Sequence, residues 1–294
     1  MRSEDYNDFP CDLCGSEDAV ELPHAREITG QLIHICTTCG FVFVRRRRSA
    51  ERIAEVWSEE IFGAGYSAAI PAVVARLTYV AETVDREIGL AGKAVCEIGA
   101  GEGVFLGIVR GNRHGVGDSF GIEPSRSNCE LLAASGIECF NGTIEAYLQS
   151  PGARRGGFDL VAILWTLENC QDLRSMLGGA HELLRDGGHV VVATGSRILV
   201  PFKKSLHAYL GRNPADTHAF RFSDSTLRGA LAVSRFAPVY VNRFLDHDVL
   251  SVIGKKSDRE QPWSGDDYLT VYTFFERWYA DSALYFPEPP SASE

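Results

Sequence analysis

Four cysteines near the N-terminus occur as two CxxC pairs, and their spacing points to metal binding. Cys11 and Cys14 lie in the segment CDLCG, and Cys36 and Cys39 lie in the segment CTTCG. A zinc ion takes four tetrahedral ligands, with thiolate sulfurs about 2.3 Å from the metal, and each CxxC turn presents two of them. A glycine follows each second cysteine and suits the positive φ that such a turn requires. We therefore predict a structural zinc site that has no open position for catalysis.

Two disulfides or a redox dithiol are the alternatives for these cysteines. The first ten residues, MRSEDYNDFP, are polar and acidic and show no secretory leader, so we expect a cytoplasmic chain in which disulfides are disfavoured. The paired repeat with flanking glycines disfavours a redox dithiol. A segment this short has too small a hydrophobic core to fold unaided, so metal binding would supply the free energy that orders it. His24 and His34 are expected to be ordinary surface or sheet residues.

A glycine-rich segment further along the chain could approach a ligand closely. Residues Glu97 to Gly103 read EIGAGEG and follow a short apolar run. Alternating glycines after a strand let the backbone touch a ligand, and the Glu97 carboxylate suits a cationic or ammonium group. The spacing is not the GxGxxG of dinucleotide-binding folds. A second acid, Glu123, ends another apolar run about twenty residues on, where a carboxylate can accept hydrogen bonds from both hydroxyls of a ribose.

The elements that must position these residues alternate between short apolar strands and helices from Lys93 onward. We predict strands at 93–98, 119–123, 137–140, 158–164 and 188–194, and helices at 103–111, 125–135, 144–149 and 171–185. Such alternation indicates a parallel sheet with helices on both faces. A helix at 224–233 and strands at 236–243 and 247–254 follow, with a tight turn at Asp246 and His247 that makes the last strand antiparallel. The predicted fold is α/β, a doubly wound, seven-stranded, mostly parallel sheet with a small N-terminal zinc ribbon.

The 294 residues are expected to divide into four parts. These are a ribbon at 1–48, a helical connector or lid at 49–90, the sheet domain at 91–256 and a C-terminal extension at 257–294. A net charge of −10 argues against broad binding to nucleic acid or anionic membranes, and no apolar run is long enough to span a bilayer. We expect a small-molecule substrate and leave the oligomeric state open. The run Arg45–Arg48 could contact phosphate or an acidic substrate, or form a solvated edge.

These motifs together resemble those of the class I S-adenosylmethionine-dependent methyltransferases. The resemblance covers about 90–255 and rests on the Glu97–Gly103 loop, Glu123, the segment Phe158-Asp-Leu-Val and the segment Leu184-Arg-Asp-Gly-Gly-His-Val-Val. The CxxC pairs, the arginines after them and an aromatic connector further resemble a bacterial subgroup. Its members carry a zinc ribbon before a Rossmann-like methyltransferase domain and often modify sugars or other small metabolites. The segment Thr217–Leu227 is similar to that subgroup's His-x-x-x-Phe-Ser stretch.

The resemblance implies how S-adenosylmethionine would be held at the carboxyl ends of the strands. Glu97 would lie near the methionine ammonium and Glu123 at the ribose. The other expected neighbours lie beneath the cofactor (Gly99, Gly101), beside the adenine (Thr143, Ile144), beside the sulfonium (Leu164, Trp165) and over it (Tyr66). For Trp165, core packing is the alternative.

Transfer to a hydroxyl also requires removal of its proton, which a histidine or a carboxylate can perform. His218 and Glu168 are the candidates, because both follow strands whose carboxyl ends should face the cofactor. A loop or capping role for His218 and a helix cap for Glu168 are the alternatives. The subgroup commonly has Glu-His after the fourth strand. This chain has Asn169 in place of that histidine, so one candidate base is missing.

We expect a methyltransferase that acts on oxygen or nitrogen of a sugar, nucleotide-sugar or secondary metabolite. Asn169 and the short C-terminal extension weaken the case for methylation of carbon. Two other classes stay open: an RNA methyltransferase that grips nucleic acid with its ribbon, and a catalytically silent adaptor that binds the cofactor.

Overall fold

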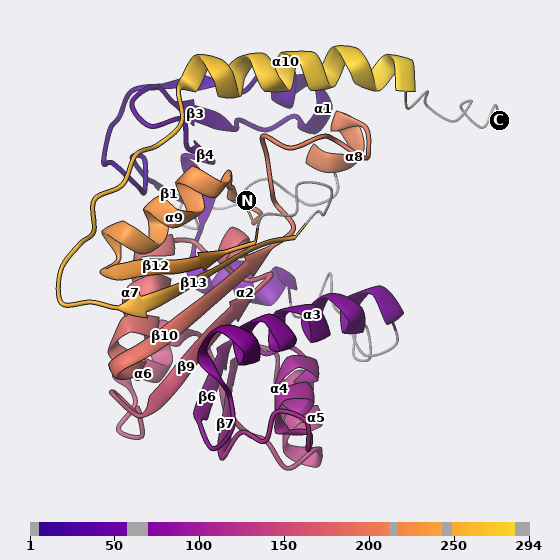
Figure 1. Ribbon diagram of the computed structural model, residues 1–294. Coiled ribbons are helices and arrows are strands. Elements are labelled where there is room, and N and C mark those ends of the chain that lie inside the picture. Colours follow the sequence, from indigo (N-terminus) through magenta and orange to yellow (C-terminus); the bar gives the residue numbers. More distant parts are fainter. Residues whose placement is uncertain (1–5, 58–69, 212–216, 243–248, 286–294) are drawn as a thin grey trace.

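The computed structural model describes residues 6–57, 70–211, 217–242 and 249–285 (Figure 1). Its strands are β1 (Tyr6–Asp8), β2 (Ala19–Glu21), β3 (His34–Cys36), β4 (Val42–Phe43), β5 (Arg46–Arg48), β6 (Ala94–Ile98), β7 (Asp118–Glu123), β8 (Glu138–Asn141), β9 (Phe158–Leu164), β10 (Leu184–Thr194), β11 (Phe220–Arg221), β12 (Phe236–Val241) and β13 (Leu250–Lys256). Its helices are α1 (Ala25–Thr29), α2 (Ala50–Glu55), α3 (Pro71–Ile88), α4 (Val104–Arg110), α5 (Arg126–Ala134), α6 (Ile144–Gln149), the 3₁₀ turn η3 (Leu167–Asn169), α7 (Leu173–Leu183), α8 (Leu206–Leu210), α9 (Asp224–Val233) and α10 (Tyr268–Tyr285). Within these ranges, no helix is both long and apolar enough to cross a membrane.

The central sheet has seven strands in the order β12-β13-β10-β9-β6-β7-β8. Neighbouring strands from β8 to β10 run parallel, and β13 runs antiparallel to both β10 and β12. This confirms the predicted seven-stranded, mostly parallel sheet with an antiparallel last strand. The predicted turn at Asp246 and His247 lies outside the described residues. The chain leaves the central strand β6 toward β7 and returns to β9 on its other side, which opens a crevice at their carboxyl ends.

Helices cover both faces of this sheet because its inner strands are apolar on both sides. Strand β9 reads FDLVAIL and is almost entirely buried. Successive side chains of a strand point to opposite faces, so Ala162 and Ile163 belong to different hydrophobic clusters. Helices α3, α4 and α5 lie on one face, and α6, α7 and α9 lie on the other (Figure 1).

The N-terminal ribbon is built into the rest of the chain. Its four-stranded sheet has the order β11-β4-β3-β2, so the edge strand β11 comes from far along the sequence. Phe220 pairs with Phe43, and the rings of Phe41 and Phe220 are 5.7 Å apart. Helix α10 runs across the ribbon next to β3 (Figure 1), and His24 stacks on Tyr279 with ring centroids 3.6 Å apart. One continuous hydrophobic cluster therefore joins the ribbon to the α6–α7 face of the large sheet.

Candidate functional site

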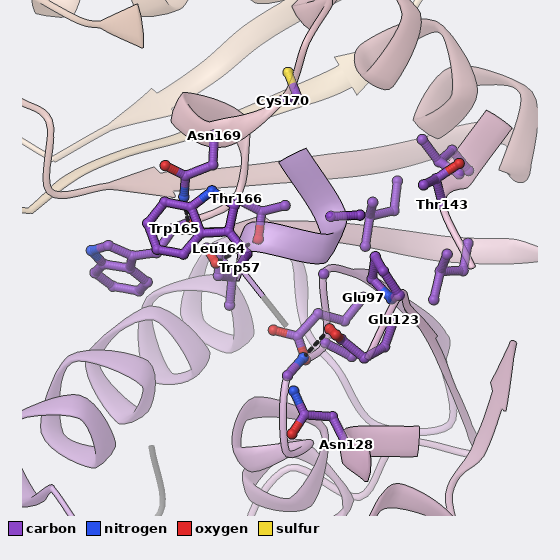
Figure 2. Close-up of a pocket in the computed structure, with 18 of the residues that line it drawn as sticks. Trp57, Glu97, Glu123, Asn128, Thr143, Leu164, Trp165, Thr166, Asn169 and Cys170 are labelled. Atoms are coloured by element: carbon purple, nitrogen blue, oxygen red, sulfur yellow. Dashed lines mark hydrogen bonds between the residues drawn. The ribbon is translucent and has the colours of Figure 1, made fainter. Parts of the chain in front are cut away.

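A cavity of about 240 Å³ opens at the carboxyl ends of β6, β7 and β9. Figure 2 shows two tryptophans and Asn169 on one side of it and two glutamates with Asn128 on the other. We call the side with Trp57, Trp165 and Asn169 the tryptophan end, and the side with Glu97 and Glu123 the carboxylate end. Most of the sequence-predicted cofactor residues line this one cavity.

Glu97 is the penultimate residue of β6 and is buried, with 3% of its surface exposed. Its Oε2 atom finds no hydrogen-bond partner among the described residues. Burial raises the pKa of this carboxyl well above its ordinary value, and the nearby charge of Glu123 adds to the effect. Burying a polar atom without a hydrogen-bond partner is unfavourable in free energy. A cationic ligand group that donates a hydrogen bond to Oε2 would therefore stabilise this carboxylate.

Glu123 ends β7, and its carboxylate is fixed by backbone donors. Oε2 accepts a hydrogen bond from the Gly101 N–H at 2.8 Å, and Oε1 accepts one from the Ser125 N–H at 2.9 Å. Burial raises the pKa of this carboxyl, while these hydrogen bonds oppose the rise. The Asn128 side chain also donates to this carboxylate, which has about four lone-pair positions, so it can still accept a hydroxyl of a ligand.

The three glycines of the Glu97–Gly103 loop all have positive φ, and they differ in how closely other atoms surround them. A Cβ on Gly99 would lie 2.4 Å from Thr166 Oγ1, and a Cβ on Gly103 would lie 2.3 Å from a methyl carbon of Leu132. These two positions are closed by packing. Gly101, with φ +54°, has no atom within 4 Å of a Cβ position, and it lines the cavity. The floor of the cavity is therefore open above Gly101.

The remaining predicted cofactor neighbours also reach the cavity wall. Thr143 caps α6, where its hydroxyl accepts a hydrogen bond from the Ala146 N–H at 3.3 Å, and Ile144 follows it. Leu164 ends β9, and Trp165 comes next with a φ of 54°, which is unusual for a non-glycine residue and common near functional sites. Tyr66 lies outside the described residues.

Glu168 lies behind the cavity wall and is 2% exposed. Burial raises the pKa of its carboxyl to about 7, although a hydrogen bond from Thr194 and the charge of Arg76 oppose the rise. The Arg76 guanidinium stands 4.1 Å above the ring of Trp165, and both residues line the cavity. Glu168 thus titrates near neutrality next to the tryptophan end without forming part of its surface.

His218 is connected to the tryptophan end through Asn169. The Asn169 amide donates to the Trp165 carbonyl at 3.0 Å, which directs Asn169 Oδ1 to His218 Nδ1 at 2.7 Å. This network assigns the Nδ1 proton to His218, which donates to Asn169. His218 Nε2 then accepts from the Ser196 hydroxyl at 2.6 Å. Asn169 lines the cavity, while His218 lies one residue behind it.

Sequence reasoning missed several residues of this wall. Helix α2 contributes Ile53, and Trp57 lies two residues after the end of this helix. Its Nε1 atom donates to the Thr217 carbonyl at 3.2 Å. Helix α3 contributes Arg76. The sequence predicted a helical connector or lid at 49–90, but the apolar spacing of this segment did not indicate that a helix face there would border a ligand cavity. In the sequence, Asn169 was notable only because it replaces a histidine that could act as a base, and its place in the cavity wall was not predicted.

The four N-terminal cysteines converge as the CxxC spacing predicted. Their sulfurs all lie within 4.8 Å of one another, and the Cys11–Cys39 and Cys14–Cys36 sulfur pairs are each 3.5 Å apart. Tetrahedral zinc with bonds of about 2.3 Å requires sulfurs about 3.8 Å apart, so the arrangement fits. The glycine after each second cysteine has positive φ, 74° at Gly15 and 69° at Gly40. Four soft sulfur ligands would fill all four coordination positions of a tetrahedral metal ion.

Comparisons with known proteins agree with this geometry. Relatives include the ubiquinone biosynthesis O-methyltransferases of Cronobacter sakazakii, 31% identical over 42% of this chain and 49% of that protein, and of Pseudomonas aeruginosa, 30% identical over 47% and 61%. The chain spans about half the length of the curated relatives it matches.

Solved structures show the same fold at low identity. The Burkholderia thailandensis 1,6-didemethyltoxoflavin-N1-methyltransferase superposes with a TM-score of 0.51 at 14% identity, covering 74% of this chain and 96% of that one. A Thermotoga maritima S-adenosylmethionine-dependent methyltransferase, described as a possible histamine N-methyltransferase, gives 0.50 at 18% identity, covering 70% and 100%.

A family model described as a methyltransferase domain matches residues 73–240, which is more than half of the chain. The match runs from α3 to β12 and so includes the three strands whose carboxyl ends border the cavity. The chain therefore belongs to this methyltransferase-domain family, and its central sheet has the fold of the class I S-adenosylmethionine-dependent methyltransferases.

Proposed function

We propose that this enzyme transfers a methyl group to an oxygen or nitrogen atom of a small molecule, such as a sugar, a nucleotide-sugar or a secondary metabolite. The observation that carries the proposal is one cavity that has both a carboxylate end suited to the cofactor and a tryptophan end beside it. The relatives named as ubiquinone biosynthesis O-methyltransferases support transfer to oxygen of a small molecule.

The carboxylate end fits S-adenosylmethionine, which supplies an electrophilic methyl group on a sulfonium. Glu97 would hold the methionine ammonium with its partnerless Oε2, and Glu123 would accept the ribose hydroxyls. The open space above Gly101 would hold the cofactor against the backbone. Thr143 and Ile144 would flank the adenine, and Leu164 and Trp165 would lie beside the sulfonium.

The tryptophan end fits an acceptor with a flat apolar face, either an aromatic ring or the CH face of a sugar. Trp57 and Trp165 provide aromatic surface, and Asn169 provides a fixed amide. These residues would align the acceptor with the methyl group and exclude water. Orientation of this kind supplies much of the rate enhancement in displacement reactions.

His218 and Glu168 remain the proposed bases for a hydroxyl acceptor. The pKa of Glu168, about 7, suits proton removal at neutral pH. His218 would act where an acceptor hydroxyl takes the place of Asn169 Oδ1 beside Nδ1. The Ser196 hydroxyl next to Nε2 can donate or accept a hydrogen bond, so it is compatible with either tautomer of the ring.

Zinc is the proposed occupant of the four-cysteine site, with a structural role. Four thiolates at this spacing match its coordination, and a closed set of protein ligands leaves no position for a substrate.

An RNA substrate receives less support. The net charge is −10, and Arg47, within the arginine run that would contact phosphate, is fully buried in an ion pair.

Labelled S-adenosylmethionine distinguishes these proposals. The enzyme is incubated with the cofactor carrying an isotopically labelled methyl group, together with either a small-molecule extract or total RNA. We expect label in a small molecule as an O- or N-methyl group, identified by mass spectrometry. Label in RNA alone, or cofactor binding without turnover on either pool, would contradict the proposal. Transfer to carbon would refute its oxygen-or-nitrogen part.

A further inference from the structure

Arg47 on β5 is an arginine buried completely, although it belongs to a run of four arginines. Its Nη1 and Nη2 atoms each donate to the Asp12 carboxylate at 2.9 Å, and Nη1 also donates to the Gln171 carbonyl at 2.5 Å. The faces of its guanidinium contact the rings of Phe9 and Phe220, with centroids 4.1 and 4.8 Å away. One side chain thus connects β5 to three segments that are distant from one another in sequence, namely 9–12, Gln171 and Phe220.

These segments include both the cysteine site and the cavity wall. Asp12 lies inside the first CxxC turn, between Cys11 and Cys14. Gln171 lines the cavity, two residues after Asn169. Helix α2 begins at Ala50, three residues after Arg47, and its apolar face borders the same cavity. The cysteine site therefore reaches the cavity in two ways, through the Gln171 backbone and through the start of α2.

Other contacts fasten the two cysteine turns to α7 of the large domain and to the C-terminal extension. Arg174 donates to the backbone carbonyls of Asp12 at 2.5 Å and of Leu13 at 2.7 Å. On the second turn, the Cys39 carbonyl accepts a hydrogen bond from the Asp266 N–H at 3.0 Å. The Arg174 contacts join the same turn to the start of α7, and Arg47 adds the hydrogen bond to the Gln171 carbonyl and the connection into α2.

A buried ion pair makes this link sensitive to the state of the ribbon. Two charges removed from water are compensated only when their geometry is good and their remaining hydrogen-bonding groups are satisfied. The position of the Asp12 carboxylate depends on the conformation of the CxxC turn that contains it. When the turn loses its shape, the Asp12 carboxylate no longer compensates the charge of Arg47. The burial of Arg47 against Gln171 then becomes unfavourable.

We propose that Arg47 is a positioning residue that couples the metal-bound first cysteine turn to the cavity wall. Through it, an ordered cysteine site fixes Gln171 and α2, and with them the tryptophan end where the acceptor would bind. This inference rests on the proposed metal at the four cysteines, and it does not depend on which acceptor the enzyme uses.

Hydrogen exchange measured by mass spectrometry on the full-length, metal-loaded protein tests the coupling without an acceptor. Arg47→Met is compared with Arg46→Met, a matched control whose arginine is exposed beside Tyr6. In Arg47→Met we expect the metal content to stay unchanged, while amides in 50–57 and 167–171 exchange about tenfold faster or more, which is about 1.4 kcal/mol of local stability. Amides of β6 and β9 should exchange as before, and Arg46→Met should match the wild type throughout. Arg47→Lys, which keeps the charge, should restore part of the protection.

Metal removal from the wild-type protein is the second arm, and it applies even where Arg47→Met fails to fold. Chelation should accelerate exchange at the cysteine turns and also at 50–57 and 167–171. Unchanged exchange in these two cavity segments after complete metal removal would overturn the proposal. Wild-type exchange in folded, metal-loaded Arg47→Met would overturn it equally. Absence of metal from the purified protein would instead refute the zinc proposal, and the Arg47 variants would then still report whether the first turn and the cavity wall are coupled.

Discussion

Replacing Glu168 with glutamine should change how the stability of the protein depends on pH. The Glu168 carboxyl is fully buried behind the tryptophan end, and burial raises its pKa from 4.5 to about 7. In the unfolded chain the same carboxyl ionises at its ordinary pKa. Between these two values the folded state holds a proton that the unfolded state has lost.

The sign and size of the effect follow from this difference. Where the folded state binds more protons, the free energy of unfolding falls as pH rises. The loss begins near the unfolded pKa and is complete above the folded pKa, so it occurs between about pH 4.5 and pH 7. A shift of about 2.5 units corresponds to about 3 kcal/mol, since one unit is worth about 1.4 kcal/mol. Glu168→Gln cannot ionise and should escape this loss.

Urea unfolding at pH 5 and pH 8 measures the effect. The fall in unfolding free energy between the two pH values should be about 2.5 kcal/mol smaller in Glu168→Gln than in the wild type, because part of the total loss has already occurred at pH 5. Glu138→Gln, at an exposed acid on β8, is the matched control and should behave as the wild type. An identical pH dependence in the wild type and Glu168→Gln would refute the reasoning. A steeper loss in Glu168→Gln would show that the ionised carboxylate is stabilised, with Arg76 as the cation that does so.

Three further predictions concern the cofactor, the metal and the base. Glu123→Ala should weaken S-adenosylmethionine binding about tenfold or more by calorimetry, since a hydrogen bond to a charged group contributes about 1.5–3 kcal/mol, and unchanged affinity would remove Glu123 from the ribose site. Elemental analysis should find one zinc per chain in protein purified without added metal, and cysteines titrating as disulfides would contradict this. With a hydroxyl acceptor, His218→Ala should lower turnover by about 10²–10⁴ while cofactor affinity is kept. A fall in cofactor affinity instead would make His218 a structural support of the wall, and full activity in both His218→Ala and Glu168→Ala would indicate an amine acceptor.

The sequence by itself determined the large sheet and the residues at its carboxyl edge. Periodicity predicted the five strands from β6 to β10 because short runs containing apolar residues alternate with helical segments there. Glu97 and Glu123 lie in the last two residues of two of these strands, and parallel strands bring their carboxyl ends to one edge, so both side chains lie at one cavity. The convergence of the four cysteines also followed from local spacing, because each CxxC turn presents two sulfurs on its own.

Only the tertiary structure decided how the ribbon and the wall of the cavity are assembled. Strand β11 completes the ribbon sheet from more than half the chain away, and a two-residue strand leaves no periodic signal. The sequence placed His218 and Glu168 near the cofactor, while the fold put both of them behind the cavity surface. From the sequence alone, Arg47 would be expected to be a solvent-exposed charge, because it lies in a run of arginines. Its burial depends on Asp12 and on the Gln171 carbonyl, which the folded chain brings to it from opposite directions along the sequence, and no local pattern encodes contacts of that range.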